Sequence, residues 1–321
     1  IWSSGKSTPL FNLGAESLQR YGMPYLMMHR ADLHRILLDA VRAIKPGAVH
    51  VASRGIGFET APHGVELLLE DGRRIAGDVL VGADGLHSRI RRQLAGADKA
   101  QFTGGMCWRG LIPVERLPEH LRRPVGVNWI GPDGHIITYP VRSGQLLNFV
   151  GHVERDDWQI ESWTEPGTVA ECAADFRGWH EDVQLMIANI GIPFKWALFL
   201  REPLQQWSKG RVTLLGDACH ATLPYLAQGA NMAIEDGLVL ARCLELQAED
   251  PAAALLRYEQ ARVERTTKMV NKSAENLTRF HNEQLKDPVL ADQYTSAEWD
   301  PERIRERYDW LFRYDAVNVP V

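Results

Sequence analysis

The sequence predicts an α/β fold that is interrupted by a largely antiparallel β-sheet segment. Two observations lead to this prediction. An apolar strand runs directly into a glycine turn and a helix at 79–96, and a similar order returns at 212–231. Between them, short strand-like runs alternate with Gly, Pro and Asp, as in an antiparallel sheet. We therefore divide the chain into four parts: 1–101, 102–200, 201–280 and 281–321.

The first predicted helix covers 29–44. Its apolar residues recur at helical spacing and fall on one face: Ile36, Leu37, Ala40, Val41 and Ile44. Asp32 either caps this helix or lies in its first turn.

A β-hairpin and a buried strand follow the first helix. Asp71-Gly72 is a strong hairpin turn dipeptide between two alternating segments. The apolar strand Val79–Val81 then ends in Gly82-Ala83-Asp84-Gly85, and a helix begins at once. This order is typical of the carboxyl edge of a parallel sheet, where open α/β folds bind ligands.

From about Phe102, the runs "MCWRGLIPV", "VGVNWIG", "HIITYPV", "LLNFVGHV" and "KWALFL" predict the strands of the β segment. We expect one helix inside this segment, around Thr168–Phe176. The α/β pattern returns at Arg211 with a strand and two or three long helices that reach about His281. The tail "WDPERIRERYDWLFRYDAV" predicts a charged helix with Trp and Tyr on one side.

Composition excludes several classes of function. The net charge is −5, which gives no reason to expect nucleic acid or an anionic membrane as a partner. No apolar run approaches the roughly 20 residues of a membrane span, and no signal peptide is recognisable. The four cysteines form no CxxC pair, so we expect no metal site, no disulfide framework and a cytoplasmic location. The oligomeric state stays open, a homodimer included.

The stretch "GRVTLLGDACHATLPYLAQGANMAIEDG", residues 210–237, predicts an anion site. Gly216 permits a tight exit from a buried strand, and Asp217 stands at the strand's carboxyl end. Gly229, Ala230 and Asn231 then begin a helix whose small side chains let a ligand approach the backbone N–H groups. The alternative is a plain turn, with Asp217 as a helix cap and Gly229 as a packing glycine.

This stretch resembles the second flavin-binding motif of the class A flavoprotein monooxygenases, the aromatic hydroxylases related to p-hydroxybenzoate hydroxylase. "VLVGADGLHSRIR" resembles the family's motif for FAD and the nicotinamide cofactor, and "HRADLH" resembles the segment whose Arg contacts FAD. "RYDWLFRYDA" resembles the carboxyl end of the salicylate hydroxylase and 6-hydroxynicotinate monooxygenase branch. The family begins with a βαβ unit carrying GxGxxG, whereas Arg54-Gly55-Ile56-Gly57 has the wrong spacing and context. We therefore expect an N-terminally truncated member with a Rossmann-like FAD-binding domain.

The resemblance implies FAD as cofactor and NADH or NADPH as reductant. It places Gly216 and Asp217 at the FAD ribityl or pyrophosphate region, Gly229–Asn231 at the isoalloxazine ring, and Pro224 on the flavin face. A helix N-terminus there stabilises the negative charge of reduced flavin. Two further residues lie near the FAD phosphates by the same resemblance: Arg30 and Asp84. Their alternatives are a solvated first-turn Arg and a simple helix cap.

The β segment should supply the substrate site. His135 and Tyr139 stand four residues apart on a predicted strand, hence on one face. A histidine is a suitable base for a phenol, and relatives acting on hydroxynicotinate and 3-hydroxybenzoate have a His at the matching position. The alternative is a structural His. Tyr139 is expected to orient the substrate, and Tyr225 to lie at the boundary of flavin and substrate. Arg109 is expected either to anchor a carboxylate or to contact the edge of the flavin.

Together these features predict a monooxygenase that uses FAD, NAD(P)H and O2 to hydroxylate a small hydroxylated aromatic acid. The expected substrate resembles salicylate, with or without loss of its carboxylate as CO2. The alternatives are a 6-hydroxynicotinate- or 3-hydroxybenzoate-type hydroxylase, or a fragment of such an enzyme without catalytic activity.

Overall fold

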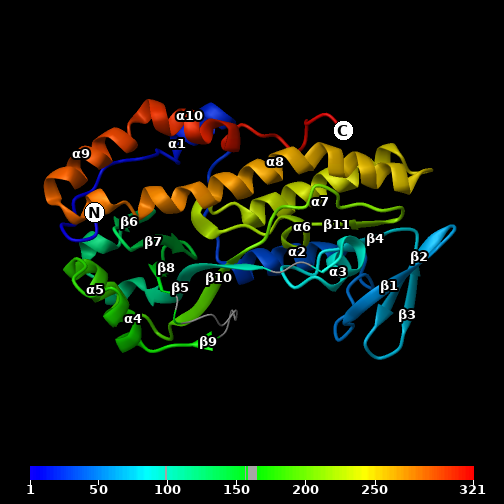
Figure 1. Cartoon of the computed structure of the whole chain (residues 1–321), viewed down its shortest axis with the longest axis horizontal. Coiled ribbons are helices and arrows are strands. Elements are labelled where there is room, and N and C mark those ends of the chain that lie inside the picture. The colour runs from blue at the N-terminus through cyan, green and yellow to red at the C-terminus, as the bar shows by residue number, and fades with distance from the viewer. Residues whose placement is uncertain (98–99, 156, 158–164) are drawn as a thin grey trace. The chain divides into compact units, whose positions relative to one another are not determined.

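A six-stranded sheet in the order β6-β7-β8-β5-β10-β9 forms the centre of one compact unit (Figure 1). The computed structural model describes residues 1–97, 100–155, 157 and 165–321. The strands are β5 (Gln101–Pro113), β6 (Val127–Gly131), β7 (Gly134–Val141), β8 (Leu146–Glu154), β9 (Glu165–Pro166) and β10 (Phe194–Leu200). β6, β7, β8 and β5 pair antiparallel in this order, which confirms the predicted antiparallel segment.

One face of this sheet is buried by two helices, α4 (Val169–Asp175) and α5 (Glu181–Ala188). Trp108, Ile136 and Phe149 point from the sheet into a core that also holds Phe176 and Met186. Only α4 was predicted. α5 has eight residues, and its apolar positions were not recognised as a helical pattern.

The same unit also contains helices from the segments 1–46 and 278–313. They are α1 (Ala15–Tyr21), α2 (Arg30–Ile44), the 3₁₀ turn η4 (Glu283–Lys286), α9 (Pro288–Glu298) and α10 (Pro301–Phe312). The predicted helix at 29–44 is confirmed as α2. Its apolar stripe is exposed, with 87% of Ile44 accessible, and none of its residues is buried. The predicted tail helix is confirmed as α10.

The second compact unit holds a parallel pair of strands, β4 (Leu80–Gly82) and β11 (Val212–Leu214). Leu80 lies opposite Val212 and Gly82 opposite Leu214, so both strands end at the same edge. A Cβ atom at Gly82 would lie 2.8 Å from side-chain atoms of Ile90 and Leu214, which explains the glycine at this position. The predicted strand–glycine turn–helix motifs are thereby neighbours in one sheet.

Helices and a small antiparallel sheet complete this unit. The helices are α3 (Arg89–Ala95), α6 (Asp217–His220), α7 (Gly229–Leu246) and α8 (Pro251–Phe280). The last three residues of α8 belong to the first unit. The sheet consists of β1 (Gly55–Ala61), β2 (Gly64–Leu69) and β3 (Arg74–Gly77). The predicted hairpin joins β2 and β3, with Gly72 at φ +86°. Gly55 and Gly57 lie in β1 and form no turn before a helix.

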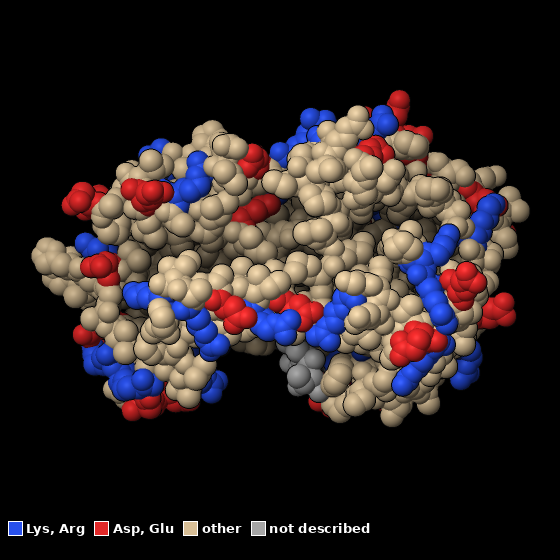
Figure 2. Space-filling model, turned by 180° about the vertical axis from the view of Figure 1, so that it is seen from behind, with Lys and Arg blue, Asp and Glu red and all other residues tan. Residues whose placement is uncertain are grey.

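On the face drawn in Figure 2, the described Lys and Arg side chains are interspersed with Asp and Glu. This mixed surface agrees with the small net charge of −5. Among the described residues, every helix is too short or too polar to cross a bilayer.

Candidate active site

Asp84 and Asp217 follow the carboxyl ends of the parallel strands β4 and β11. The two carboxylates have different surroundings. Asp84 accepts hydrogen bonds from Ser88 Oγ at 2.5 Å and from the backbone N–H groups of Arg89 and Ile90 at 2.8 and 3.3 Å. It therefore caps the short helix α3, the alternative considered for this residue.

The N-terminus of α7 forms a cradle beside Asp217. The side chain of Gln228 caps no N–H group of this helix, and helix N-terminal N–H groups lack intrahelical partners. A Cβ atom at Gly229 would lie 3.3 Å from Thr222 Cγ2 and 3.9 Å from Asp217 Oδ1, so a larger side chain would fill the space between them. Asp217 is exposed, and within the described residues its carboxylate has no hydrogen-bond partner. This arrangement fits an electron-rich ring with a polar chain attached.

The turn into Asp217 is held by a buried polar network. Asp236 of α7 accepts hydrogen bonds from the Gly216 N–H at 3.1 Å, from His220 Nε2 at 2.6 Å and from Arg262 Nε at 2.8 Å. Gly216 has a φ of +64°, a conformation that favours glycine. Burial would raise the pKa of Asp236, but its bonds to His220 and Arg262 outweigh burial and lower it. The network fixes the position of the glycine turn.

A second buried cation joins the two strand–turn motifs. Arg91 of α3 donates from Nη1 to the carbonyl oxygens of Ala218 and Cys219 at 3.2 and 3.4 Å. Sequence reasoning assigned no role to His220 and missed Arg91, Asp236 and Arg262. The available indication was Asp236, which stands between apolar stretches, whereas Arg91 and Arg262 lie in segments rich in charged residues.

Pro224 begins the 3₁₀ turn η3 (Pro224–Leu226) in the same unit. The Tyr225 side chain is buried, and Asn276 Nδ2 donates to the Tyr225 carbonyl at 3.2 Å. Ser273 Oγ donates to the Leu223 carbonyl at 2.7 Å, so α8 holds the start and the middle of the turn. The expected roles of Pro224 and Tyr225 stay predictions.

In the first unit, the six-stranded sheet has a second face, opposite the core formed with α4 and α5. This face carries polar side chains, and we call it the polar sheet face. His135 lies opposite His152, and Tyr139 lies opposite Asn148, on β7 and β8. Side chains on one face recur every second residue. A row of four side chains therefore crosses the sheet between the His135–His152 pair and the Tyr139–Asn148 pair: Asn128, Ile137, Val150 and Arg109. His135 and Tyr139 thus share a face, as predicted, with an apolar floor of Ile137 and Val150.

Arg109 lies at one end of this row. Its guanidinium carbon is 5.0 Å from the centre of the Trp196 ring. Burial lowers the pKa of Arg109, and the positive charge of Arg30 lowers it further. Burial also raises the pKa of Tyr139, against the effect of Arg109. The exposed Arg30 thus lies near enough to act on the half-buried Arg109, and an anion beside the two cations would be stabilised.

Two amide atoms near this row have no partner among the described residues. They are Asn128 Oδ1 and Asn148 Nδ2, both buried from solvent. Buried polar atoms are nearly always hydrogen-bonded, so each of these atoms can pair with a polar group that enters this region.

The His135 side chain is buried, with 2% of its surface accessible to solvent. Burial lowers its pKa well below the usual range, and the neighbouring His152 and His281 lower it further. Its Nδ1 atom is 2.7 Å from Nε2 of His281. The neutral form is therefore favoured, which suits a proton acceptor.

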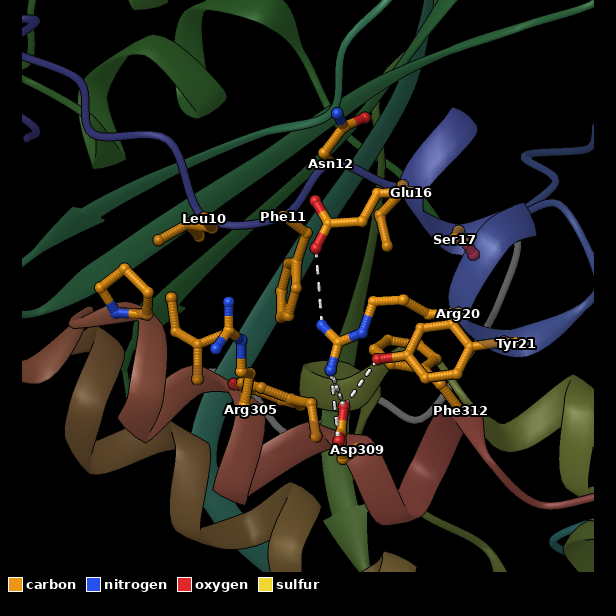
Figure 3. Close-up of a pocket in the computed structure, with 14 residues that line it drawn as sticks. Leu10, Phe11, Asn12, Glu16, Ser17, Arg20, Tyr21, Arg305, Asp309 and Phe312 are labelled. Atoms are coloured by element: carbon orange, nitrogen blue, oxygen red, sulfur yellow. Dashed lines mark hydrogen bonds and ion pairs between the residues drawn. The ribbon is translucent and has the colours of Figure 1, made fainter.

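A cavity of about 170 Å³ lies between the segment before α1 and helix α10 (Figure 3). Arg20 extends between Glu16 and Asp309, and the Tyr21 hydroxyl donates to Asp309 at 2.7 Å. These polar groups satisfy one another, and the volume is below the roughly 300–1,000 Å³ of small-molecule sites. None of the predicted site residues lines this cavity.

Comparison with known proteins gives a consistent match. The sequence profile of a family described as FAD binding domain matches residues 11–273. A 3-amino-4-hydroxybenzoate 2-monooxygenase from Streptomyces platensis is 39% identical, covering 99% of this chain and 78% of its own length. A 6-hydroxynicotinate 3-monooxygenase from Bordetella bronchiseptica is 33% identical, covering 100% and 77%. A solved salicylate hydroxylase substrate complex has a TM-score of 0.74 and 29% identity, covering 91% and 76%.

Proposed function

The chain belongs to the FAD-binding domain family and is related to flavin-dependent aromatic monooxygenases, and on this premise we propose that it hydroxylates a small hydroxylated aromatic acid. FAD is the cofactor, NADH or NADPH the reductant and O2 the oxidant. The observation that carries the proposal is the polar sheet face, where His135 and Tyr139 flank an apolar floor and Arg109 lies at its side.

Bound FAD would supply the transfer of electrons from NAD(P)H to O2 and the activation of one oxygen atom. In this chain, the N-terminus of α7 at Gly229–Asn231 would hold the electron-rich ring, and Asp217 its polar chain. Pro224 would contact the ring, and Gly216 would give the backbone its turn. Arg30 and Asp84 are proposed near the phosphates, Asp84 through the helix that it caps.

The substrate groups are assigned by charge. Arg109 would bind the carboxylate, because a half-buried guanidinium is stabilised by an anion and forms bidentate bonds to it. His135 would accept the proton of the ring hydroxyl, since an ionised phenol is more readily attacked by an electrophilic oxygen. Tyr139 and Tyr225 would orient the ring. Asn128 and Asn148 would complete the hydrogen bonds with their free amide atoms.

A salicylate-type acid is the leading substrate, with or without decarboxylation. Acids of the 6-hydroxynicotinate and 3-hydroxybenzoate type are alternatives, as is 3-amino-4-hydroxybenzoate, on which a 39% identical relative acts. A homodimer and a cytoplasmic location stay predictions.

The test uses the purified chain saturated with FAD. NADH and NADPH oxidation are measured with each of these four acids, and the products are identified by mass spectrometry. One acid should give a product heavier by one oxygen atom, or its decarboxylated equivalent. A flavin titration is run beside it, because a chain that binds no FAD would support the alternative of a fragment without catalytic activity. Reduction of O2 to peroxide with every acid would contradict the proposal.

A further inference from the structure

Three imidazole rings and one carboxylate form a continuous chain of contacts at the polar sheet face. His281 follows α8, and its Nε2 atom is 2.7 Å from Nδ1 of His135 and 3.2 Å from Nδ1 of His152. Its other nitrogen, Nδ1, is 2.6 Å from Oε1 of Glu154 at the end of β8. The three rings are buried, whereas 48% of the Glu154 side chain is exposed. The chain thus leads from a buried ring to solvent.

The carboxylate determines which nitrogens carry protons. An ionised carboxylate only accepts hydrogen bonds, so His281 donates its Nδ1–H to Glu154. In neutral His281 the lone pair then lies on Nε2, which accepts the Nδ1–H of His135. Nε2 is left as the basic nitrogen of His135. All donors therefore point from His135 towards Glu154.

We propose that His281 and Glu154 form a relay that carries to solvent the proton that His135 takes from the substrate. This proposal rests on the proposed role of His135. The substrate O–H bond breaks as an N–H bond forms at His135 Nε2, and the Nδ1 proton of His135 passes to His281 Nε2. The Nδ1 proton of His281 passes to Glu154 Oε1 and from there to water. Three protons each move by one step, the net result is the release of one proton to water, and the electron pair stays on the substrate oxygen.

Burial explains why His135 needs such a relay. An imidazolium held at a site with 2% exposure would be costly, and two further imidazoles lie against it. Glu154 and Asp133 provide the negative charges that act on His281, whose pKa is lowered by burial and raised by these two acids. A proton is therefore better stabilised at His281 than at His135, so it is drawn outward.

The test compares Glu154→Gln with the FAD-loaded wild-type protein. Gln keeps the size of the side chain and an oxygen that accepts the His281 N–H, but it cannot take the proton. Proton release on mixing with the accepted aromatic acid is followed with an indicator dye by stopped flow. We expect release to slow about tenfold or more in Glu154→Gln. Added imidazole buffer should restore the rate in this variant and leave the wild type unchanged.

Glu119→Gln is the matched control, because Glu119 is an exposed acid of the same unit outside the histidine cluster. It should release the proton at the wild-type rate. Unchanged release in Glu154→Gln, with wild-type hydroxylation intact, would overturn the relay alone. Loss of hydroxylation by the wild type itself would instead contradict the proposed function.

Two measurements on the protein without substrate are independent of its activity. Nitrogen-15 NMR of histidine-labelled protein should show the Nδ1–H tautomer for His135 and for His281. An Nε2–H tautomer for His281 would overturn the proposal. Metal analysis is the second measurement, since ligand atoms of the three histidines converge within 4.8 Å. Stoichiometric zinc or copper would also overturn it, because a bound metal occupies the lone pairs that the relay requires.

Discussion

Nε2 of His220 lies 2.6 Å from Oδ2 of Asp236, and both side chains are buried in the unit that carries the flavin-type motif. The same oxygen accepts the N–H of Gly216, and the other oxygen accepts Arg262 Nε. One carboxylate thereby connects the glycine turn, α6, α7 and α8. The relationship implies that the shape of the cofactor cradle depends on a residue that does not face the cofactor.

Asp236→Ala should lower the free energy of unfolding by about 3–5 kcal/mol, because it removes one of the two charge partners of the buried Arg262, which keeps only Glu235, and leaves buried His220 without its acceptor. Chemical denaturation followed by circular dichroism measures this loss. Asp78→Ala, which removes an exposed acid of the same unit, should change the free energy of unfolding by less than about 0.5 kcal/mol. Equal effects of the two substitutions would contradict the role of the network.

Asp236 also predicts how stability depends on pH. Its pKa is lowered in the folded protein, so its contribution is fully present above the unfolded-state pKa of about 3.9. That contribution is lost as the pH falls through the lower folded-state value. The wild type should therefore lose stability below about pH 4 more steeply than Asp236→Asn, which cannot ionise. Thermal unfolding from pH 2 to pH 7 measures the difference, and parallel curves would contradict it.

The cradle in front of α7 can be tested with two glycines of one helix. Gly229→Val should raise the Kd for FAD about tenfold or more, because its side chain would fill the space beside Thr222 and Asp217. At Gly237 an added Cβ atom meets no atom within 4 Å. Gly237→Ala should therefore keep the FAD affinity and stabilise the protein by about 0.5–1 kcal/mol. Isothermal titration and denaturation measure the two effects, and normal flavin binding by Gly229→Val would contradict the assignment.

The sequence predicts local structure well where the pattern is long. The apolar stripe of α2 and the strands β5 to β8 follow from periodicity alone, and the first glycine motif indicates the carboxyl edge of a parallel sheet. The exposure of the apolar face of α2 could not be predicted, because periodicity identifies the apolar face of a helix but not whether another element covers it.

Only part of the candidate site can be predicted from sequence periodicity. His135 and Tyr139 share a strand, so their common face follows from a period of two. His281 is 146 positions from His135 and reaches it only through the course of α8, which no local pattern encodes. Asp236 and Arg262 were missed for the same reason, since the contact joins two helices.

His135→Ala should separate the two half-reactions. Because the histidine acts on the substrate hydroxyl, hydroxylation should slow about 100-fold or more, whereas flavin reduction by NAD(P)H should change less than about threefold. Rapid-mixing spectroscopy of the flavin resolves both rates. His120→Ala, which alters an exposed histidine of the same unit, is the control and should leave both rates unchanged. Equal slowing of both half-reactions by His135→Ala would rule out its assignment as the base.

Arg109→Gln should raise KM for the aromatic acid about tenfold or more, since hydrogen bonds to a charged group contribute about 1.5–3 kcal/mol. A phenol analogue without the carboxylate should bind the variant and the wild type alike. The pair of ligands separates loss of the carboxylate contact from a general change in the pocket. Weaker binding of both ligands would assign Arg109 a packing role over Trp196 instead.

Asn148 gives the sharpest test of the polar sheet face, because its two expected effects have opposite signs. Nδ2 of Asn148 is buried without a partner among the described residues, so it destabilises the ligand-free fold. Asn148→Leu is similar in size and should leave the free energy of unfolding unchanged or raise it by about 1–3 kcal/mol.

The same substitution should raise KM for the aromatic acid, because the ligand loses a donor that the fold holds ready. Denaturation and steady-state kinetics measure the two effects on one preparation. The control is Asn189→Leu at the half-buried C-cap of α5, where Nδ2 already donates to the Leu185 carbonyl. A stabilised variant with an unchanged KM would show that the amide does not meet the substrate. A destabilised variant would show that Nδ2 has a structural partner, and the orphaned amide would no longer mark a ligand site.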